Sequence, residues 1–382
     1  MKIKFCTIEH TNKVVWKYKQ GQPNYLCDPD TEIDPTAYGC WVSAMQGENL
    51  PISFLRYGKK YKNNFWGKIY RLQDKIAGRT LFRNIKYLKK FNIILALAHR
   101  FNFQEIVDCL EEARKVNRKA FYIGVLGNCP GLIRQAILEK KNFQGFIKFL
   151  KAVDLFINNY QEAQKYFELL SQTIDSQNKL GEKKNSEKIV FLPQFYPFHF
   201  AKEFKKNYQE KEKIIHLAGP TDREDNLANQ YVAVALQREF PEFLITIPNL
   251  DNLNIEPLKL ARARYKVFPQ MKWQDYLSEL SRSFLVLNLD NIWTMGRVVA
   301  DCAGVGTPCI GINATNQFKM FPSLRVEDMI GIQQAVILGK KLIEERKFYE
   351  HVVKYACEKV EEQNYKKRKR ALIEILKRYK KG

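Results

Sequence analysis

The stretch that most constrains the fold runs from residue 284 to residue 312 and reads FLVLNLDNIWTMGRVVADCAGVGTPCIGI. Residues 284–289 form an apolar run long enough for one buried strand, and residues 309–312 form a second. Between them, residues 294–303 predict a helix, which Gly304 and Gly306 end and Pro308 cannot continue. Parallel strands need such a crossover between them, so we expect an α/β unit here.

The start of this predicted helix carries residue types that suit an anion. Thr294 or Asn291 can cap the helix, and Gly296 lets the backbone approach a ligand closely. The N–H groups of a first helical turn and the helix dipole favour a phosphate, and Arg297 adds a bidentate cation. Asp301 lies two turns beyond Thr294, where we expect it to bind a hydroxyl pair such as that of a ribose. A strand–helix–strand unit without a ligand is the alternative.

Length and composition set the outer bounds. A chain of 382 residues is long enough for two domains of ordinary size, and no apolar run approaches the length of a membrane-spanning helix. The first residues, MKIKFCTIEH, predict a strand rather than a signal peptide. Eight scattered cysteines without a CxxC pair, and only five histidines, argue against structural zinc. We therefore expect reduced thiols, a cytoplasmic protein and no metal site.

The formal net charge of +22 points to polyanionic surroundings: phosphate-bearing substrates, an anionic membrane face or nucleic acid. Residues 56–90 are the most basic stretch and interleave lysines and arginines with aromatic residues. Such a segment can lie on an anionic bilayer, follow a nucleic-acid backbone, or form a solvated helix whose rings pack inward. The same alternatives hold for the basic block KKRKR at residues 366–370.

Strand and helix patterns alternate along both halves of the chain. In the first half we predict strands at residues 2–8, 50–55, 92–98, 120–126 and 189–192, another strand after Asp154, helices at 36–45 and 103–116, and a loop at 172–187. In the second half we predict a basic helix at 201–213, strands at 214–218 and 243–247, a helix at 226–240, and helices from residue 326 onward. This order predicts two Rossmann-like, doubly wound α/β domains, residues 1–200 and 201–382, with helices at the C-terminus.

Several segments together, roughly residues 91–365, resemble the retaining, nucleotide-sugar-dependent glycosyltransferases of the GT-B fold, group 1 type. FNIILALAHRF resembles that family's strand ending in histidine, and LKAVDLFINNYQE its strand-then-helix segment. KIVFLPQFYPFHF is similar to its interdomain segment, and KIIHLAGPTDRED to the first strand and loop of its donor domain. VFPQMKWQDYLSELSRSFLVLNLD resembles its base-binding turn, helix and strand, and the following helix ends in Gly-x-Pro as the family's does.

The resemblance implies a function and a set of site residues. It implies two domains that face a cleft, with the acceptor bound by the first and the nucleotide-sugar by the second. It implies transfer of a sugar from a nucleoside-diphosphate sugar to a lipid-linked or polysaccharide acceptor, without a metal or other cofactor. It also implies that the transfer takes place at the cytoplasmic face of the membrane, with the enzyme bound peripherally to the inner membrane. The implied catalytic residues are His99, Arg297 and Asp301, and the implied donor-binding residues are Gly219, Arg223, Gln270, Met271, Thr294, Met295 and Gly296.

The sequence departs from the family pattern at one of its paired acidic positions. The family carries two glutamates separated by seven residues, and these positions align with Trp293 and Asp301. The lysine that follows the family's donor-domain loop has no counterpart, which leaves Arg223 as the basic residue there. Two other functions therefore stay open: a glycosyltransferase that modifies DNA, and a catalytically inactive member that serves as a nucleotide-binding or scaffold subunit.

Overall fold

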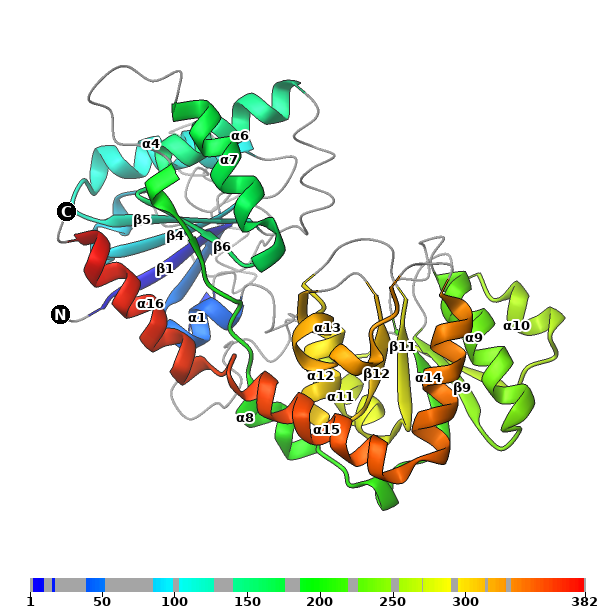
Figure 1. Cartoon of the computed structure of the whole chain (residues 1–382). Helices are drawn as coiled ribbons and strands as arrows, with labels where there is room; N and C mark the ends of the chain where they lie inside the picture. The colour runs from blue at the N-terminus through cyan, green and yellow to red at the C-terminus, as the bar shows by residue number, and fades with distance from the viewer. Residues whose placement is uncertain are drawn as a thin grey trace, which may run out of the picture. The chain divides into compact units, whose positions relative to one another are not determined.

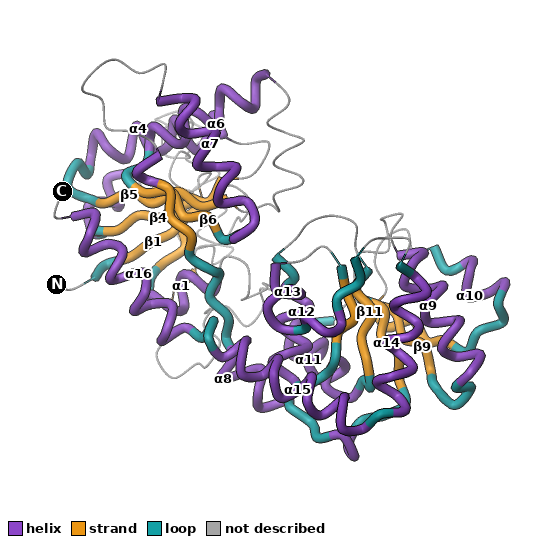
Figure 2. Tube along the Cα trace, in the orientation of Figure 1, coloured by secondary structure: helices purple, strands orange, loops and turns teal. Residues whose placement is uncertain are grey.

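The computed structural model describes residues 3–9, 16–17, 39–51, 85–98, 103–126, 140–175, 186–218, 226–248, 254–269, 271–289, 295–312, 315–327 and 331–380. The chain divides into two compact units (Figures 1 and 2). Unit 1 comprises Met1–Phe195 and Arg368–Gly382, and unit 2 comprises Tyr196–Lys367. The sequence suggests one division near residue 200, and the structure adds a return of the chain to unit 1 at Arg368.

Unit 1 is built on a sheet in the order β2-β3-β1-β4-β5-β6-β7. Its strands are β1 (Phe5–Glu9), β2 (Trp16–Lys17), β3 (Glu48–Pro51), β4 (Ile93–Ala98), β5 (Phe121–Leu126), β6 (Leu155–Asn158) and β7 (Ile189–Phe191). β2 pairs antiparallel with β3, and the other described pairings are parallel. β4 is apolar and buried throughout, as a strand covered on both faces must be.

Helices cover both faces of this sheet (Figure 1). The helical elements of unit 1 are α1 (Gly39–Met45), η1 (Ile85–Lys90), α4 (Phe103–Val116), α6 (Lys140–Ala152), η2 (Gln161–Ala163), α7 (Gln164–Asp175), η3 (Ser186–Lys188) and most of α16 (Tyr365–Lys380). The face under α4, α6 and α7 is filled by aromatic rings in edge and tilted contact, among them Phe103, Phe146 and Phe156. α16 buries Leu372 and Leu376, which explains why the end of the chain belongs to unit 1.

Unit 2 is built on an all-parallel sheet in the order β10-β9-β8-β11-β12. Its strands are β8 (Ile214–Leu217), β9 (Leu244–Pro248), β10 (Tyr265–Phe268), β11 (Leu285–Asn288) and β12 (Cys309–Gly311). The chain runs outward from β8 to β10 on one side and then resumes at β11 on the other. The strand order therefore reverses between β8 and β11, and in open α/β sheets ligands bind outside the carboxyl ends of the strands at such a point.

The helices of unit 2 also form two layers. They are α8 (Phe198–Ala201), η4 (Lys202–Phe204), η5 (Tyr208–Glu210), α9 (Asn226–Glu239), α10 (Glu256–Leu260), α11 (Trp273–Arg282), α12 (Arg297–Val305), α13 (Thr315–Met320), η6 (Pro322–Leu324), α14 (Ile332–Glu344) and α15 (Arg346–Glu361). α9 and α14 pack together on one face of the sheet, and α11, α12 and α15 lie on the other (Figure 1). α12 is buried from Val299 to Val305.

The structure confirms the predicted α/β class with two parallel sheets, and most of the predicted elements. The helix predicted at residues 103–116 has the same bounds as α4, and the strand predicted at 92–98 differs from β4 by one residue. The strand–helix–strand unit at residues 284–312 is present as β11, α12 and β12. The strand predicted at 50–55 is described only as far as Pro51, and most of the basic stretch 56–90 lies outside the described residues.

Two segment predictions are wrong. The basic helix predicted at residues 201–213 is replaced by the short turns α8, η4 and η5. The reason is Asn207, which has extended backbone angles and forms a capping box with Glu210 that begins a new turn. The loop predicted at residues 172–187 is partly helical, because α7 continues to Asp175 with Ser171 and Ile174 buried.

Within the described ranges, no helix combines the length and apolar character that crossing a membrane would require. The cysteines at positions 6, 109, 302, 309 and 357 are free thiols.

Candidate functional site

The carboxyl ends of β8 and β11 are linked by a buried amide at the point where the strand order reverses. Asn229 on α9 donates from Nδ2 to the carbonyl of Ala218 at 3.1 Å, and its Oδ1 accepts from the backbone N–H of Leu289 at 2.9 Å. Asn229 is only 3% exposed. The Asn229 side chain thus fixes the spacing of β8 and β11 at their carboxyl ends.

The turn that leads from β11 into α12 is held by a chain of buried amides. Gly296 precedes the helix in the left-handed conformation, with φ 74° and ψ 60°, which favours glycine. Its carbonyl accepts from Asn316 Nδ2 at 2.9 Å, and the backbone N–H of Asn316 donates to the carbonyl of Met295 at 3.0 Å. Gln363 Nε2 donates to Asn316 Oδ1 at 2.8 Å. α12 therefore begins at a fixed position, and its first-turn N–H groups point away from the helix.

The predicted cap of this helix is wrong. The sequence suggests Thr294 or Asn291 as the N-cap residue, but the helix begins at Arg297 and Gly296 occupies the N-cap position without a side-chain cap bond. The later start places Gly296 directly at the first turn, where a residue without a Cβ leaves the N–H groups most accessible to an anion.

Arg297 and Asp301 lie one turn apart on α12 but differ in exposure. Arg297 Nε lies 3.9 Å from Asp301 Oδ2, with 38% of the arginine side chain exposed and 1% of the aspartate side chain. Asp301 Oδ1 accepts from the hydroxyl of Tyr196 at 2.8 Å and from Trp273 Nε1 at 3.2 Å. Arg297 is thus accessible at the helix start, whereas Asp301 faces the interior of unit 2.

Burial governs the ionisation of Asp301. It raises the pKa of the Asp301 carboxyl from 3.8 to about 6, and Arg297, Tyr196 and Trp273 oppose this rise. Asp301 Oδ2 has no hydrogen-bond partner within the described part of the chain. These contacts give Asp301 a structural role, since it joins α12 to the start of α11 and to the first residue of unit 2. Its contact with a ribose stays a prediction.

Gly304 allows Tyr196 to approach α12. A Cβ at this position would lie 2.8 Å from Ala201 Cβ and 2.9 Å from the Tyr196 hydroxyl oxygen. We expect Gly304→Ala to lower the free energy of unfolding by about 1–3 kcal/mol, as overpacking in a core does. Chemical denaturation measures this, and a double-mutant cycle with Tyr196→Phe should recover part of the loss. Strictly additive effects of the two substitutions would show that the hydroxyl is not the obstacle.

Asn316 offers a test of the turn itself. In Asn316→Asp the group that donates to the Gly296 carbonyl becomes an oxygen, so two acceptors face each other. We expect a loss of about 1–3 kcal/mol in the free energy of unfolding and weaker binding of the expected nucleoside diphosphate, which calorimetry measures. Asn364→Asp is the matched control, because the Asn364 Oδ1 accepts the Lys367 N–H at 2.9 Å and an aspartate keeps that acceptor. Equal effects of the two substitutions would contradict an anchoring role for Asn316.

The structure describes five of the ten residues named as site residues from the sequence. Met295, Gly296, Arg297 and Asp301 are gathered at the start of α12, and Met271 lies half-buried between β10 and α11. The other predicted site residues lie outside the described residues: His99, Gly219, Arg223, Gln270 and Thr294. In the sequence, each of these five follows the C-terminal end of a parallel strand by no more than about six residues.

Five residues that fix the site were missed. Asn229, Asn316 and Gln363 anchor the backbone around it, and Tyr196 and Trp273 hold Asp301. They come from α9, α13, the end of α15, the start of unit 2 and α11. Each partner is distant in sequence, so residue spacing could not reveal these pairs. For Asn229 a signal was available, because this amide precedes an apolar run in its helix and a buried polar group needs a partner.

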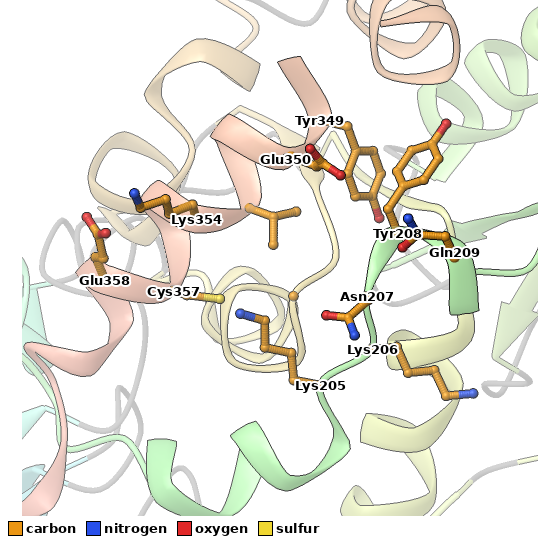
Figure 3. A pocket seen from close by; sticks show the side chains of 12 residues that line it. Lys205, Lys206, Asn207, Tyr208, Gln209, Tyr349, Glu350, Lys354, Cys357 and Glu358 are labelled. Carbon is orange, nitrogen blue, oxygen red and sulfur yellow. The ribbon is translucent and has the colours of Figure 1, made fainter. Parts of the chain in front are cut away.

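A hollow in unit 2 lies at the C-terminal end of α12 (Figure 3). It measures about 440 Å3 and is lined by Lys205, Gly306, Lys354 and Cys357, among others. The Cys357 thiol donates to the carbonyl of Ala303 at 3.2 Å, and burial raises its pKa although Lys205 opposes the rise. The lysines complement the negative end of the α12 dipole, and the protonated thiol is a poor nucleophile. We assign this hollow a structural role.

No family model matches the chain, and no curated protein sequence matches it. Solved structures, however, share its fold. Alr3699/HepE from Anabaena, in complex with UDP, is 10% identical, with 98% of this chain and 100% of that chain covered and a TM-score of 0.62. A UDP-forming α,α-trehalose-phosphate synthase from Burkholderia xenovorans is 9% identical, with 98% and 99% covered and a TM-score of 0.61.

A third similar structure covers less of both chains. The pneumococcal O-GlcNAc transferase GtfA, in complex with UDP and GlcNAc, is 15% identical, with 77% of this chain and 59% of that chain covered and a TM-score of 0.54. At such identities the likeness shows the fold, and the chain has the GT-B fold that its sequence segments suggest.

Proposed function

We propose that this protein is a glycosyltransferase that uses a nucleoside-diphosphate sugar, with UDP as the nucleotide. The single observation that carries the proposal is the anchored turn at Gly296, which presents the first turn of α12 beside the point where the strand order reverses. The UDP bound in the Anabaena HepE and pneumococcal GtfA structures supports the choice of nucleotide. An anion site of this kind suits the diphosphate of the donor.

The chemistry follows from the charge that develops as the donor breaks. When the bond between the sugar and the diphosphate is cleaved, negative charge grows on the departing phosphate oxygen. The N–H groups at the start of α12 and the guanidinium of Arg297 are fixed in place, so they stabilise that charge without reorganising. In this proposal Gly219, Arg223 and Thr294 complete the diphosphate site, and Gln270 and Met271 lie against the base.

The acceptor is proposed from the sequence resemblance. We propose a lipid-linked or polysaccharide acceptor bound by unit 1, with the enzyme attached peripherally to the inner face of the membrane. In the sequence His99 directly follows β4, and the strand order of unit 1 reverses between β1 and β4. A histidine there is suited to accept the proton of an attacking hydroxyl, because its ordinary pKa lies close to neutral pH.

A screen of nucleotide-sugars tests this function. Thermal shift and calorimetry should show binding of UDP and of at least one UDP-sugar, and slow release of UDP from that sugar should be detectable without an acceptor. Binding of a UDP-sugar without any release of UDP would favour a catalytically inactive scaffold protein. The absence of a response to every nucleotide-sugar and to UDP would overturn the proposal.

A further inference from the structure

A band of basic residues follows one edge of the sheet in unit 1. We call it the basic edge; it consists of Lys4, Lys89, Lys90, Arg118, Lys119, Lys151 and Lys188. Each of these residues lies within four positions of the start of β1, β4, β5, β6 or β7. Parallel strands begin at the same edge of a sheet, so the basic residues gather along the edge opposite the strands' carboxyl ends. All are exposed except Lys188, which is half-buried.

The nearby carboxylates of Asp154 and Glu48 already accept hydrogen bonds. Asp154 Oδ1 accepts from Arg114 at 2.8 Å, and its Oδ2 accepts from the backbone N–H of Tyr122 at 2.8 Å. Glu48 accepts from the hydroxyl of Tyr87 through both carboxylate oxygens. Across the ranges that the structure describes, no ion pair joins an acid to Arg118 or Lys151. Arg118 and Lys151 therefore carry positive charge that no ion pair among the described residues offsets.

A cavity of about 450 Å3 opens in the basic edge at the starts of β5, β6 and β7. Its charged and polar lining consists of Arg114, Arg118, Lys151, Asp154, Lys188 and Tyr379. The end of α16 closes one side, where the Tyr379 hydroxyl donates to the carbonyl of Glu187 at 2.7 Å. This size suits a small molecule or a lipid headgroup.

The chemistry of the lining selects an anion. Arg118, Lys151 and Lys188 are donors only, and converging cations repel one another unless an anion lies between them. Both oxygens of Asp154 already accept hydrogen bonds, which leaves little to attract a cation. The guanidinium of Arg118 matches phosphate in bidentate geometry, and the two amines add point charges. Carboxylates carry less charge per group than a phosphate monoester, which is a dianion above about pH 6.

A nucleic-acid surface fits the same edge less well. Proteins that bind single strands stack bases on exposed aromatic rings. The exposed large apolar side chains among the described residues are Tyr166, Leu169, Tyr231, Leu260 and Ile337, and none of them lies at the starts of these strands. The cavity at the basic edge has room for a single group and does not form a groove that could follow a nucleic-acid backbone.

We propose that this cavity binds a phosphate monoester, held by Arg118, Lys151 and Lys188 and carried either by a small soluble molecule or by a lipid headgroup. The site lies in unit 1 at the amino ends of the strands, whereas the proposed donor site lies in unit 2. The phosphate-monoester site and the donor site can therefore be tested independently.

The experiment compares the wild type with Arg118→Gln/Lys151→Gln in two arms. Calorimetry with glycerol 3-phosphate tests a soluble source. Co-sedimentation with phosphatidylcholine vesicles containing phosphatidic acid, a monoester, or phosphatidylglycerol, a diester, tests a lipid source. Lys165→Gln/Lys347→Gln is the matched control, since it removes the same charge from exposed positions on α7 and α15.

We expect at least one monoester probe to bind the wild type and the control, and to bind the double variant at least tenfold more weakly. Binding of glycerol 3-phosphate identifies a soluble source, and binding of phosphatidic acid in preference to phosphatidylglycerol identifies a lipid. UDP binding should stay within twofold in all three proteins, which separates this site from the donor site. The proposal is overturned if neither probe binds, if the double variant binds as well as the wild type, or if only a DNA duplex distinguishes the two.

Discussion

Replacing Arg297 with alanine is expected to lower the affinity for UDP by roughly 10- to 100-fold, as the loss of a hydrogen bond to a charged group does. The expected loss in kcat/KM is larger, about 100- to 1,000-fold, because the guanidinium acts mainly on the charge that develops when the donor breaks. Arg297 is 38% exposed in its side chain and begins α12, so its removal leaves no cavity in the core. Calorimetry with UDP and initial rates with the best donor measure the two effects.

Two controls separate geometry from charge. Arg297→Lys keeps the positive charge but loses the bidentate geometry of the guanidinium. We expect its UDP affinity and its kcat/KM to lie between those of the wild type and Arg297→Ala. Lys347→Ala removes one positive charge at an exposed position of α15 and should leave UDP affinity unchanged. If Arg297→Ala bound UDP within twofold of the wild type, Arg297 would have no place in the donor site.

Asp301→Asn is expected to become progressively more stable than the wild type as the pH rises from 4 to about 7. Burial raises the pKa of Asp301 from 3.8 in the unfolded chain to about 6 in the folded one. Between these values the unfolded chain loses the proton while the folded protein keeps it, so the wild type loses stability as the pH rises. Above about pH 6 the loss is complete and amounts to about 3 kcal/mol. The asparagine stays neutral and avoids this loss.

Chemical denaturation at several pH values measures the difference between variant and wild type. The amide oxygen of the asparagine can still accept from Tyr196 and Trp273, so the variant is expected to fold. Asp275→Asn makes the same change at an exposed position of α11, where we expect no such trend. A difference between Asp301→Asn and the wild type that did not vary with pH would mean that Asp301 is not held in a buried environment.

Elements with strong local patterns could be predicted from the sequence. α4 has apolar residues at helical spacing, and β4 is a continuous apolar run, so the prediction of each was accurate to within one residue. α12 was located by the same reasoning, because Gly306 has φ 72° at its C-terminal end and Pro308 follows. These signals lie within a few residues of the element that they define.

Contacts between distant segments could not be predicted. Asp301 looked accessible, because its spacing from Thr294 suggested two turns of an exposed helix face. Its burial depends on Tyr196 and Trp273, which lie 105 and 28 residues away in the sequence. The turn at Gly296 depends in the same way on Asn316 and Gln363, so its rigidity could not be read from residues 284–312 alone.

The net charge of the chain does not reveal where the basic residues of the basic edge lie in the fold. The sequence drew attention to residues 56–90, which include Lys89 and Lys90, and to the consecutive basic block at 366–370. The residues of the basic edge are spread from Lys4 to Lys188 and gather because parallel strands start at one edge. A count of charges along the chain gives no sign of such a site.

A crystal structure of the complex with UDP tests the central claim most directly. We predict that the diphosphate lies within hydrogen-bond distance of the backbone N–H groups of the first turn of α12 and of the Arg297 guanidinium, with the Gly296 carbonyl still bound to Asn316. A diphosphate bound elsewhere in unit 2, or only in the cavity of the basic edge, would contradict the account.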